Sequence, residues 1–207
     1  MFQEIFQTLE YDDLYQKMKQ DGWFPFLELL GDDFDDLRWL YKTDNYSENR
    51  LSEKFGEERI GKIKNRWWSK EIFESKKPIL QKGLNEFLEN NQRGDISCIK
   101  ILVSEIDGVI REIYYQETGK GKAKTSDLKD FVKEKGRRKG GDDSSLLLPA
   151  AFFDYLDDKF YDQFDLAKGG PEVARPSSTH GVVDPEKYTH DKALQAILTL
   201  DQLYFYF

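Results

Sequence analysis

Cysteine is nearly absent from this 207-residue sequence, since Cys98 is the only one. A single cysteine excludes an internal disulfide and any zinc site built from cysteines, and it favours a reducing, cytoplasmic setting. Long apolar runs are also missing. The longest, residues 146–153 (LLLPAAFF), contains a proline and is far shorter than the roughly 18 residues that a membrane span needs. We expect a chain that does not cross a membrane and has no secretory signal in its acidic first segment.

Basic residues are also fewer than acidic ones. The chain has 31 Lys and Arg against 39 Asp and Glu, which gives a formal net charge of −8. A protein that coats duplex nucleic acid gains affinity by neutralising phosphates and usually carries a positive surplus. The balance therefore counts against a general nucleic-acid binder. It is compatible with an enzyme that has one local basic cleft, because the field in a cleft can oppose the net charge.

Strand-like alternation of apolar and polar residues is absent over any length that builds a sheet, which predicts an all-α fold. The length allows one large or two small domains. Pro78 predicts a kink or break, residues 93–95 predict a turn, and Thr189 is suited to cap the last helix. Helical spacing of apolar residues predicts helices over residues 2–18, 69–92, 96–116, 126–135, 146–167 and 189–207, with short helices and loops over 32–58.

One of only two histidines lies in a segment suited to chemistry. Arg175 and His180 are five positions apart, just before the last predicted helix, and Gly181 follows them. Histidine exchanges protons near neutral pH, and the planar guanidinium fork of arginine holds a phosphate. RNA can be cut without a metal when a base removes the proton from a 2′-hydroxyl that then attacks the adjacent phosphate. The pair is suited to that reaction.

This arrangement resembles the HEPN superfamily of helical, mostly RNA-cutting proteins. Its members carry an Arg, four to six residues and a His at this place in their helical order. Many bacterial members continue with a Gly and a leucine-rich closing helix. The predicted helix over 96–116 is also similar to its HEPN counterpart, which has an acid followed by Gly near its middle, here Asp107 and Gly108. The resemblance covers roughly residues 70–207.

The resemblance implies a helical bundle of HEPN type over residues 69–207, with a helical extension of unknown role over residues 1–68. It implies a metal-independent endoribonuclease without a cofactor, acting in phage defence or in a toxin–antitoxin system. Arg175 and His180 would be catalytic, with Asp107, Ser178 and Thr179 in support. The implied partners are an RNA substrate, a second copy of the chain in a homodimer, and an antitoxin or other regulator protein.

The chain departs from the family pattern at Pro176, where active members usually have a small polar residue. A second function therefore stays open, a HEPN-like module that has lost catalysis and binds a partner protein or RNA. Both motif residues also have structural interpretations. His180 can be a surface or capping residue, and Arg175 can form an ion pair with Glu172 or Asp184.

Other segments admit functional and structural interpretations side by side. Residues 120–139 hold nine Lys or Arg and three acids, which suits either a grip on RNA phosphates or a mobile solvated loop around a short helix. Residues 62–68 (KIKNRWW) suit base stacking or core packing. The aspartates between 154 and 165 match no calcium loop and predict a solvated helix face. His190 is predicted to be a solvated helix-end residue, and the run after Gly119 lacks the ending of a phosphate-binding loop.

Overall fold

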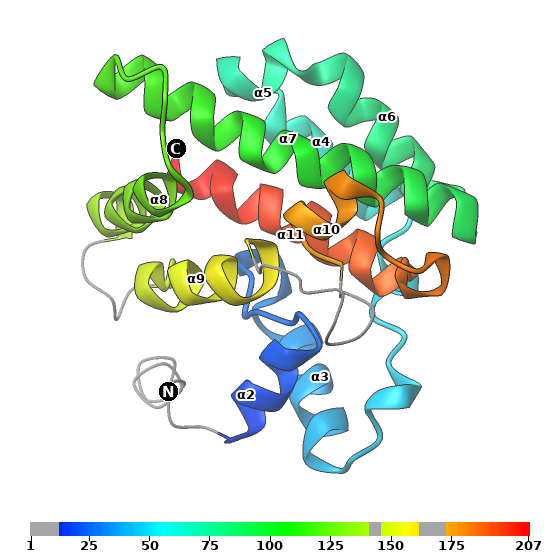
Figure 1. Cartoon of the computed structure of the whole chain (residues 1–207). Helices are drawn as coiled ribbons and strands as arrows, with labels where there is room; N and C mark the ends of the chain where they lie inside the picture. The colour runs from blue at the N-terminus through cyan, green and yellow to red at the C-terminus, as the bar shows by residue number, and fades with distance from the viewer. Residues whose placement is uncertain (1–12, 141–145, 162–172) are drawn as a thin grey trace.

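The computed structural model describes residues 13–140, 146–161 and 173–207, and all secondary structure in those ranges is helical (Figure 1). The all-α prediction is therefore confirmed at the level of fold class. None of the described helices is long and apolar enough to cross a membrane. The helices are α2 (Asp13–Gln20), α3 (Asp32–Lys42), α4 (Glu57–Trp67), α5 (Glu71–Ser75), α6 (Lys77–Leu88), α7 (Gln92–Thr118), α8 (Thr125–Gly140), α9 (Pro149–Tyr155), α10 (Arg175–His180) and α11 (His190–Tyr206). Short 3-10 turns lie at Leu27–Leu29, Tyr46–Glu48, Ser52–Lys54 and Pro185–Lys187, and a π-helical turn at Leu156–Phe160 follows α9.

The longest helix, α7, begins earlier than the sequence predicts. Asn91 caps it, because the Asn91 side chain accepts a hydrogen bond from the backbone N–H of Gly94 at 3.0 Å. The chain reverses at Asn90, which has a left-handed backbone with φ of 47°. The predicted turn at residues 93–95 is therefore wrong, since those residues form the first turn of α7.

Two other predicted helix boundaries are confirmed. Thr189 caps α11, and its hydroxyl accepts a hydrogen bond from the backbone N–H of Lys192 at 3.3 Å. The segment predicted over 69–92 divides into α5 and α6 beside Pro78, which occupies the first turn of α6. Proline is tolerated there because the first N–H groups of a helix have no intrahelical acceptor.

The remaining helix predictions need correction or lie outside the described ranges. Residues 125–140 form a continuous helix that buries Leu128, Val132 and Gly136. The helix predicted over 126–135 is therefore confirmed, and the mobile loop expected after residue 135 is wrong up to residue 140, where the described range ends. α4 falls partly in a region predicted to hold only short helices and loops. The predicted first helix is described only from residue 13, and part of the predicted helix over 146–167 also lies outside the described residues.

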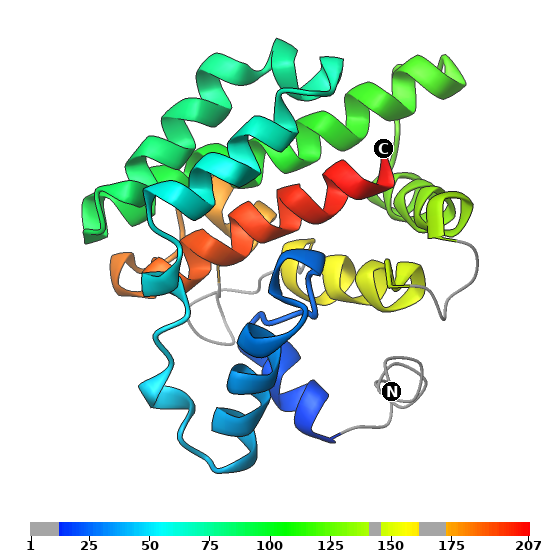
Figure 2. The same ribbon diagram turned by 180° about the vertical axis from the view of Figure 1, so that it is seen from behind.

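The centre of the molecule is α11, whose residues 193–203 are all buried. In both views it runs between α4, α6 and α7 on one side and α9 with the N-terminal helices on the other (Figures 1 and 2). It contacts α4, α6, α7 and α8. A helix buried on every side needs internal partners for its polar side chains, because an unpaired buried polar group costs free energy.

Those polar side chains connect α11 to the N-terminal part of the chain. Gln195 donates to the backbone carbonyl of Asp21 at 2.9 Å, and Gln202 accepts from the backbone N–H of Leu27 at 3.0 Å. Described residues on both sides of position 68 also belong to one hydrophobic core. The first part of the chain is thus packed on the rest rather than separate from it.

The KIKNRWW segment lies in α4 and contributes to the core. Trp67 is fully buried, and its indole N–H donates to Asp201 of α11 at 2.9 Å. Ile63 is fully buried as well. The core-packing interpretation is confirmed for Trp67, and a buried ring cannot stack on a base from solution.

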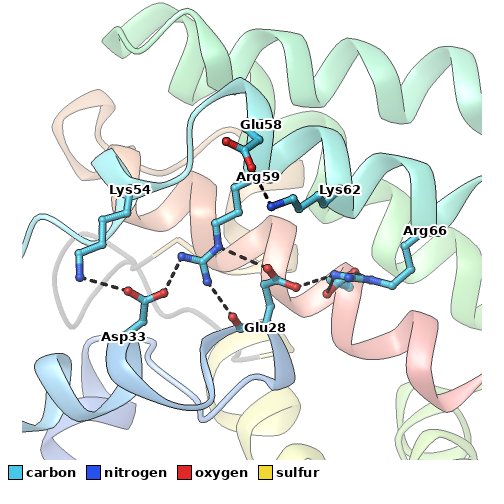
Figure 3. Close-up of polar contacts among 8 residues, drawn as sticks. Glu28, Asp33, Lys54, Glu58, Arg59, Lys62 and Arg66 are labelled. Atoms are coloured by element: carbon cyan, nitrogen blue, oxygen red, sulfur yellow. Dashed lines mark hydrogen bonds and ion pairs between the residues drawn. The ribbon is translucent and has the colours of Figure 1, made fainter.

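A charged network lies along the same contact (Figure 3). Glu28 accepts hydrogen bonds from Arg59 at 3.3 Å and from Arg66 at 2.7 Å. Arg66 also binds both carboxylate oxygens of Asp201, at 3.1 and 2.7 Å, and Arg59 binds Asp33 at 2.5 Å. The network joins the turn at residues 27–29 to α3, α4 and α11.

Gly94, in the first turn of α7, lies close to the backbone of α6. A Cβ at this position would lie 2.3 Å from the backbone carbonyl oxygen of Glu86. A backbone atom cannot move aside as a side chain can, so Gly94→Ala would force the two helices apart. We expect a loss of about 1–3 kcal/mol in the free energy of unfolding in urea. The control is Gly61→Ala in α4, where nothing lies within 4 Å of the added Cβ and a stabilisation of about 0.5–1 kcal/mol is expected. Equal stability of both variants would contradict the described crossing.

Lys70 lies against the aromatic end of α11. Its ammonium group donates to the backbone carbonyl of Tyr204 and lies 3.9 Å from the centre of that ring. Burial, together with the positive charge of Lys139, lowers the pKa of Lys70 to about 8. The pKa of a lysine in an unfolded chain is about 10.4. Between these two values the unfolded chain binds more protons than the folded one, so the contribution of Lys70 to stability becomes more favourable as pH rises.

Raising the pH from about 8 to about 10 is therefore expected to stabilise the wild type relative to Lys70→Met, which has no amine to titrate. The free energy of unfolding of both proteins would be measured in urea at each pH. The control is Lys122→Met, at an exposed position. The difference in free energy of unfolding between this variant and the wild type should be the same at both pH values. If the difference in free energy of unfolding between Lys70→Met and the wild type also stayed constant with pH, the lowered pKa of Lys70 would be contradicted.

Candidate active site

The predicted motif forms one short helix, α10, which packs on α7 (Figure 1). The helix begins after Ala174, whose backbone N–H donates to the Ser177 hydroxyl at 3.0 Å. It ends at Gly181, which has a φ of 69° that glycine adopts without strain. Pro176 lies buried in the first turn, where its missing N–H costs nothing. Local sequence thus determines both ends of the helix.

Arg175 lies against Asp107 in the middle of α7. Its Nη2 donates to Oδ2 of the carboxylate at 3.2 Å, and the two side chains are 34% and 8% exposed. Arg111 donates to the same oxygen at 2.7 Å, and the Tyr161 hydroxyl donates to Oδ1 at 3.1 Å. Donors on both oxygens fix the orientation of the carboxylate. The structure therefore brings together two of the predicted site residues, Arg175 and Asp107.

Arg111 and Tyr161 were not among the residues predicted for this site. The hydrogen bond to Asp107 raises the pKa of Arg111. Burial, and then the negative charge of Asp107, raise the pKa of Tyr161 far above its usual value, so its hydroxyl stays a donor. The four-residue spacing from Asp107 to Arg111 was a readable signal, because such pairs face each other on a helix. Tyr161 is 54 positions away from Asp107, and nothing local indicates the contact.

His180 lies at the other end of α10 and is exposed. It lines a hollow together with Lys100 and Ser104 of α7 and with Ser178. Since Arg175 contacts position 107 and His180 lies near positions 100–104, α10 runs in the opposite direction to α7. His180, Lys100 and Ser104 bring an imidazole ring, an ammonium group and a hydroxyl to one open surface, and the buried Ser178 lies beneath it.

The Ser178 hydroxyl is buried and has no hydrogen-bond partner within the part of the chain that the structure describes. Buried polar groups in native proteins are nearly always paired, so an orphan of this kind needs an explanation. A bound ligand or a water would supply the missing partner. The side chain of Thr179, another predicted supporting residue, is not among those that the structure describes. Glu172, one of the two acids predicted as an ion-pair partner of Arg175, also lies outside the described residues.

His190 is packed between helices, so its predicted solvated position is wrong. Its Nδ1 lies 2.7 Å from Oδ1 of Asp95, and its ring stacks on Phe87 with centroids 4.2 Å apart. The His190 side chain is only 18% exposed. The pair joins the first turns of α7 and α11, which is a structural role.

The two described aspartates after α9 lie on the surface, as a solvated helix face predicts. Asp157 and Asp158 are exposed and form ion pairs with Lys129 and Lys19. Over residues 13–140, 146–161 and 173–207, no three potential metal-binding side chains form a group. Asp154 lies within α9, and the remaining two aspartates of that prediction, at positions 162 and 165, lie outside the described residues.

Comparisons of the chain with protein-family models, curated proteins and solved structures found no match. The chemistry of the site therefore has to be inferred from its own groups. A guanidinium oriented by a buried carboxylate and an exposed imidazole beside a hydroxyl and an ammonium group form a set suited to an anion that undergoes proton transfer.

Proposed function

We propose that the chain is a metal-independent endoribonuclease of HEPN type. The observation that carries this proposal is the placement of Arg175 and His180 at opposite ends of one short helix over α7. Asp107 orients Arg175 at 3.2 Å, and His180 lies in a hollow with Lys100 and Ser178. Positioned cations and an acid–base group beside one surface are what cleavage of a phosphodiester requires.

The proposed reaction uses the RNA's own nucleophile. His180 removes the proton from a 2′-hydroxyl, the freed oxygen attacks the adjacent phosphorus, and the bond from phosphorus to the next 5′-oxygen breaks. The products are a 2′,3′-cyclic phosphate and a 5′-hydroxyl whose proton comes from the imidazolium or from water. Arg175 binds the phosphate oxygens, whose negative charge grows during the attack.

The proposal is tested by incubating a mixed RNA pool, tRNA included, with the purified full chain in excess EDTA. We expect discrete cuts that leave 2′,3′-cyclic phosphates. A synthetic substrate with a 2′-deoxynucleotide immediately before a mapped cut should resist cleavage. A requirement for a divalent cation, or unchanged cutting of the deoxy substrate, would contradict the mechanism.

Pro176 favours a second function. It stands where active HEPN proteins usually have a small polar residue, and it is buried in the first turn of α10. The chain would then be an inactive HEPN-like module that binds a partner protein or RNA. Absence of cleavage by a chain shown to be folded would support this alternative.

The proposal includes the partners that the family resemblance implies. Two copies would place both α10 helices in one shared cleft, and an antitoxin or other regulator would restrain the activity in phage defence or a toxin–antitoxin system. The mass of the purified chain in solution, measured by light scattering, tests the homodimer. A monomer at all concentrations would contradict it.

A further inference from the structure

A row of side chains continues along α7 beyond the proposed site. The row lies on one face of the helix, because its members are three or four residues apart. From first to last it extends about 22 Å at about 1.5 Å per residue. α10 lies over the first half of the row, and the second half leads toward the C-terminal end of α7. Its members are Lys100, Ser104, Asp107, Arg111 and Tyr115.

Tyr115 ends the row with a ring that is 56% exposed. A single exposed aromatic residue is ordinary on a protein surface. Here, however, the ring lies beside a lysine-rich loop, since a Cβ at Gly121 would lie 4.0 Å from Tyr115 Cε2. Exposed aromatic rings next to cations are the combination with which proteins bind unpaired bases.

The loop after α7 is held against the same face. It turns back past the end of α7 on its way to α8 (Figure 1). Arg111 donates from Nη1 to the backbone carbonyl of Ala123 at 3.1 Å, which fixes the loop beside the row. Lys120, Lys122 and Lys124 are exposed on it.

The same arginine connects the loop to the proposed site. Arg111 also donates to Asp107, which accepts from Arg175 of α10. One continuous set of hydrogen bonds therefore runs from the lysine loop to the motif helix. The loop, the ring and the motif are parts of one surface.

Positive charge is concentrated on this loop and on the α8 helix that follows it, although the chain as a whole is acidic. Residues 120–139 have nine basic and three acidic side chains in a chain of net charge −8. Farther along α8 some of that charge is neutralised, because Lys129 and Lys135 form ion pairs with Asp157 and Glu117. Within the described ranges, no ion pair involves the three loop lysines at 120, 122 and 124. A local positive field of this kind attracts a polyanion.

We propose that this face binds single-stranded RNA and guides it across α10. Tyr115 stacks on an unpaired base, and the three loop lysines contact the flanking phosphates. The strand is single because a ring can stack on a base face only where the base is not already stacked within a duplex. The inference rests on the proposed ribonuclease function for the kind of polyanion, and it adds where that polyanion is held.

The test measures binding of the full chain to a short fluorescein-labelled 2′-O-methyl RNA, which lacks the attacking hydroxyl. Fluorescence anisotropy gives the affinity over a range of salt concentrations. Tyr115→Ala should weaken binding by about 5- to 140-fold, the equivalent of one lost base stack. Combined Lys120→Gln, Lys122→Gln and Lys124→Gln should lower the slope of log K against log salt by about 2, at about 0.7 for each phosphate contact.

Matched controls remove the same groups elsewhere. Tyr46→Ala deletes another exposed ring, which is 52% exposed. A triple Lys→Gln variant at the exposed positions Lys17, Lys62 and Lys82 deletes the same charge. Equal losses in test and control variants would overturn the inference. So would polyglutamate that competes as well as unlabelled single-stranded RNA, or duplex RNA that binds as tightly.

Cleavage in excess EDTA is assayed separately, so that the two proposals can fail independently. Binding that depends on Tyr115 and the loop lysines, in a chain that cuts no RNA, supports the inference and overturns the nuclease. Cleavage with an unchanged KM in both test variants supports the nuclease and overturns the inference.

Discussion

His180→Ala is expected to lower the rate of RNA cleavage by about 10²- to 10⁴-fold, because the variant has no group to take the proton from the 2′-hydroxyl. The side chain is exposed, and substitutions at such positions usually change stability by no more than about 0.5 kcal/mol. The rate would be measured in single turnovers on a mapped substrate in excess EDTA, with urea unfolding of the same preparations.

Arg175→Ala is expected to lower the cleavage rate by about 10²- to 10³-fold in the same assay. This is the usual effect of losing one hydrogen-bond donor to a developing negative charge. Arg175→Lys keeps the positive charge but not the planar fork, so it should recover only part of the rate. Arg50→Ala, at a side chain that is 63% exposed, is the matched control and should cleave as the wild type does. Equal cutting by all these proteins would mean that the activity belongs to another site or to a contaminant.

Arg66→Met is expected to lower the free energy of unfolding by about 3–5 kcal/mol, because it leaves a buried carboxylate without its counter-charge. The carboxylate is that of Asp201, which is 1% exposed, and Arg66 binds both of its oxygens. Burial raises the pKa of Asp201, and the hydrogen bonds from Arg66 oppose that effect. Among the described residues, losing them would leave only the indole N–H of Trp67 as a donor to this carboxylate.

A double variant separates the charge from the packing. Arg66→Met combined with Asp201→Asn should be more stable than Arg66→Met alone, since a neutral amide needs no counter-charge and can still accept from Trp67. Lys62→Met, on the exposed side of the same helix, is the control. Urea unfolding at neutral pH measures all four proteins. If Arg66→Met lowered the free energy of unfolding by less than about 1 kcal/mol, the ion pair between Arg66 and Asp201 would contribute no more than an ordinary surface ion pair does.

The long helices were predictable because their apolar residues recur with the period of the helix itself. α7 and α11 are of this kind, and Thr189 gave a local signal for the start of α11. α8 was predicted over residues 126–135 only, because the basic and glycine-containing stretch that follows gave no sign that the helix continues to residue 140. The interior position of His190 was not predictable, since it depends on Asp95 and Phe87, which are distant in sequence.

The proposed site was predictable to the extent that it lies in one stretch of chain. Arg175 and His180 are close in sequence, and Asp107 stood out in the middle of a strong helix. The hydrogen bond from Tyr161 and the hollow that Lys100 shares with His180 arise from how α7 is packed. No local pattern encodes such packing.

The central position of α11 determines when the protein can fold during its synthesis. Every other described element precedes α11 in the chain, yet α4, α6, α7 and α8 all contact it. At about 5–20 residues per second, roughly 7 to 27 seconds pass between synthesis of the first residue of α4 and that of the first residue of α11. α6 and α7 can pack on each other earlier, but until α11 emerges the surfaces of these helices that contact it have no partner to pack against. The nascent chain therefore depends on its last described helix, and it exposes apolar surface to chaperones and proteases until that helix is made.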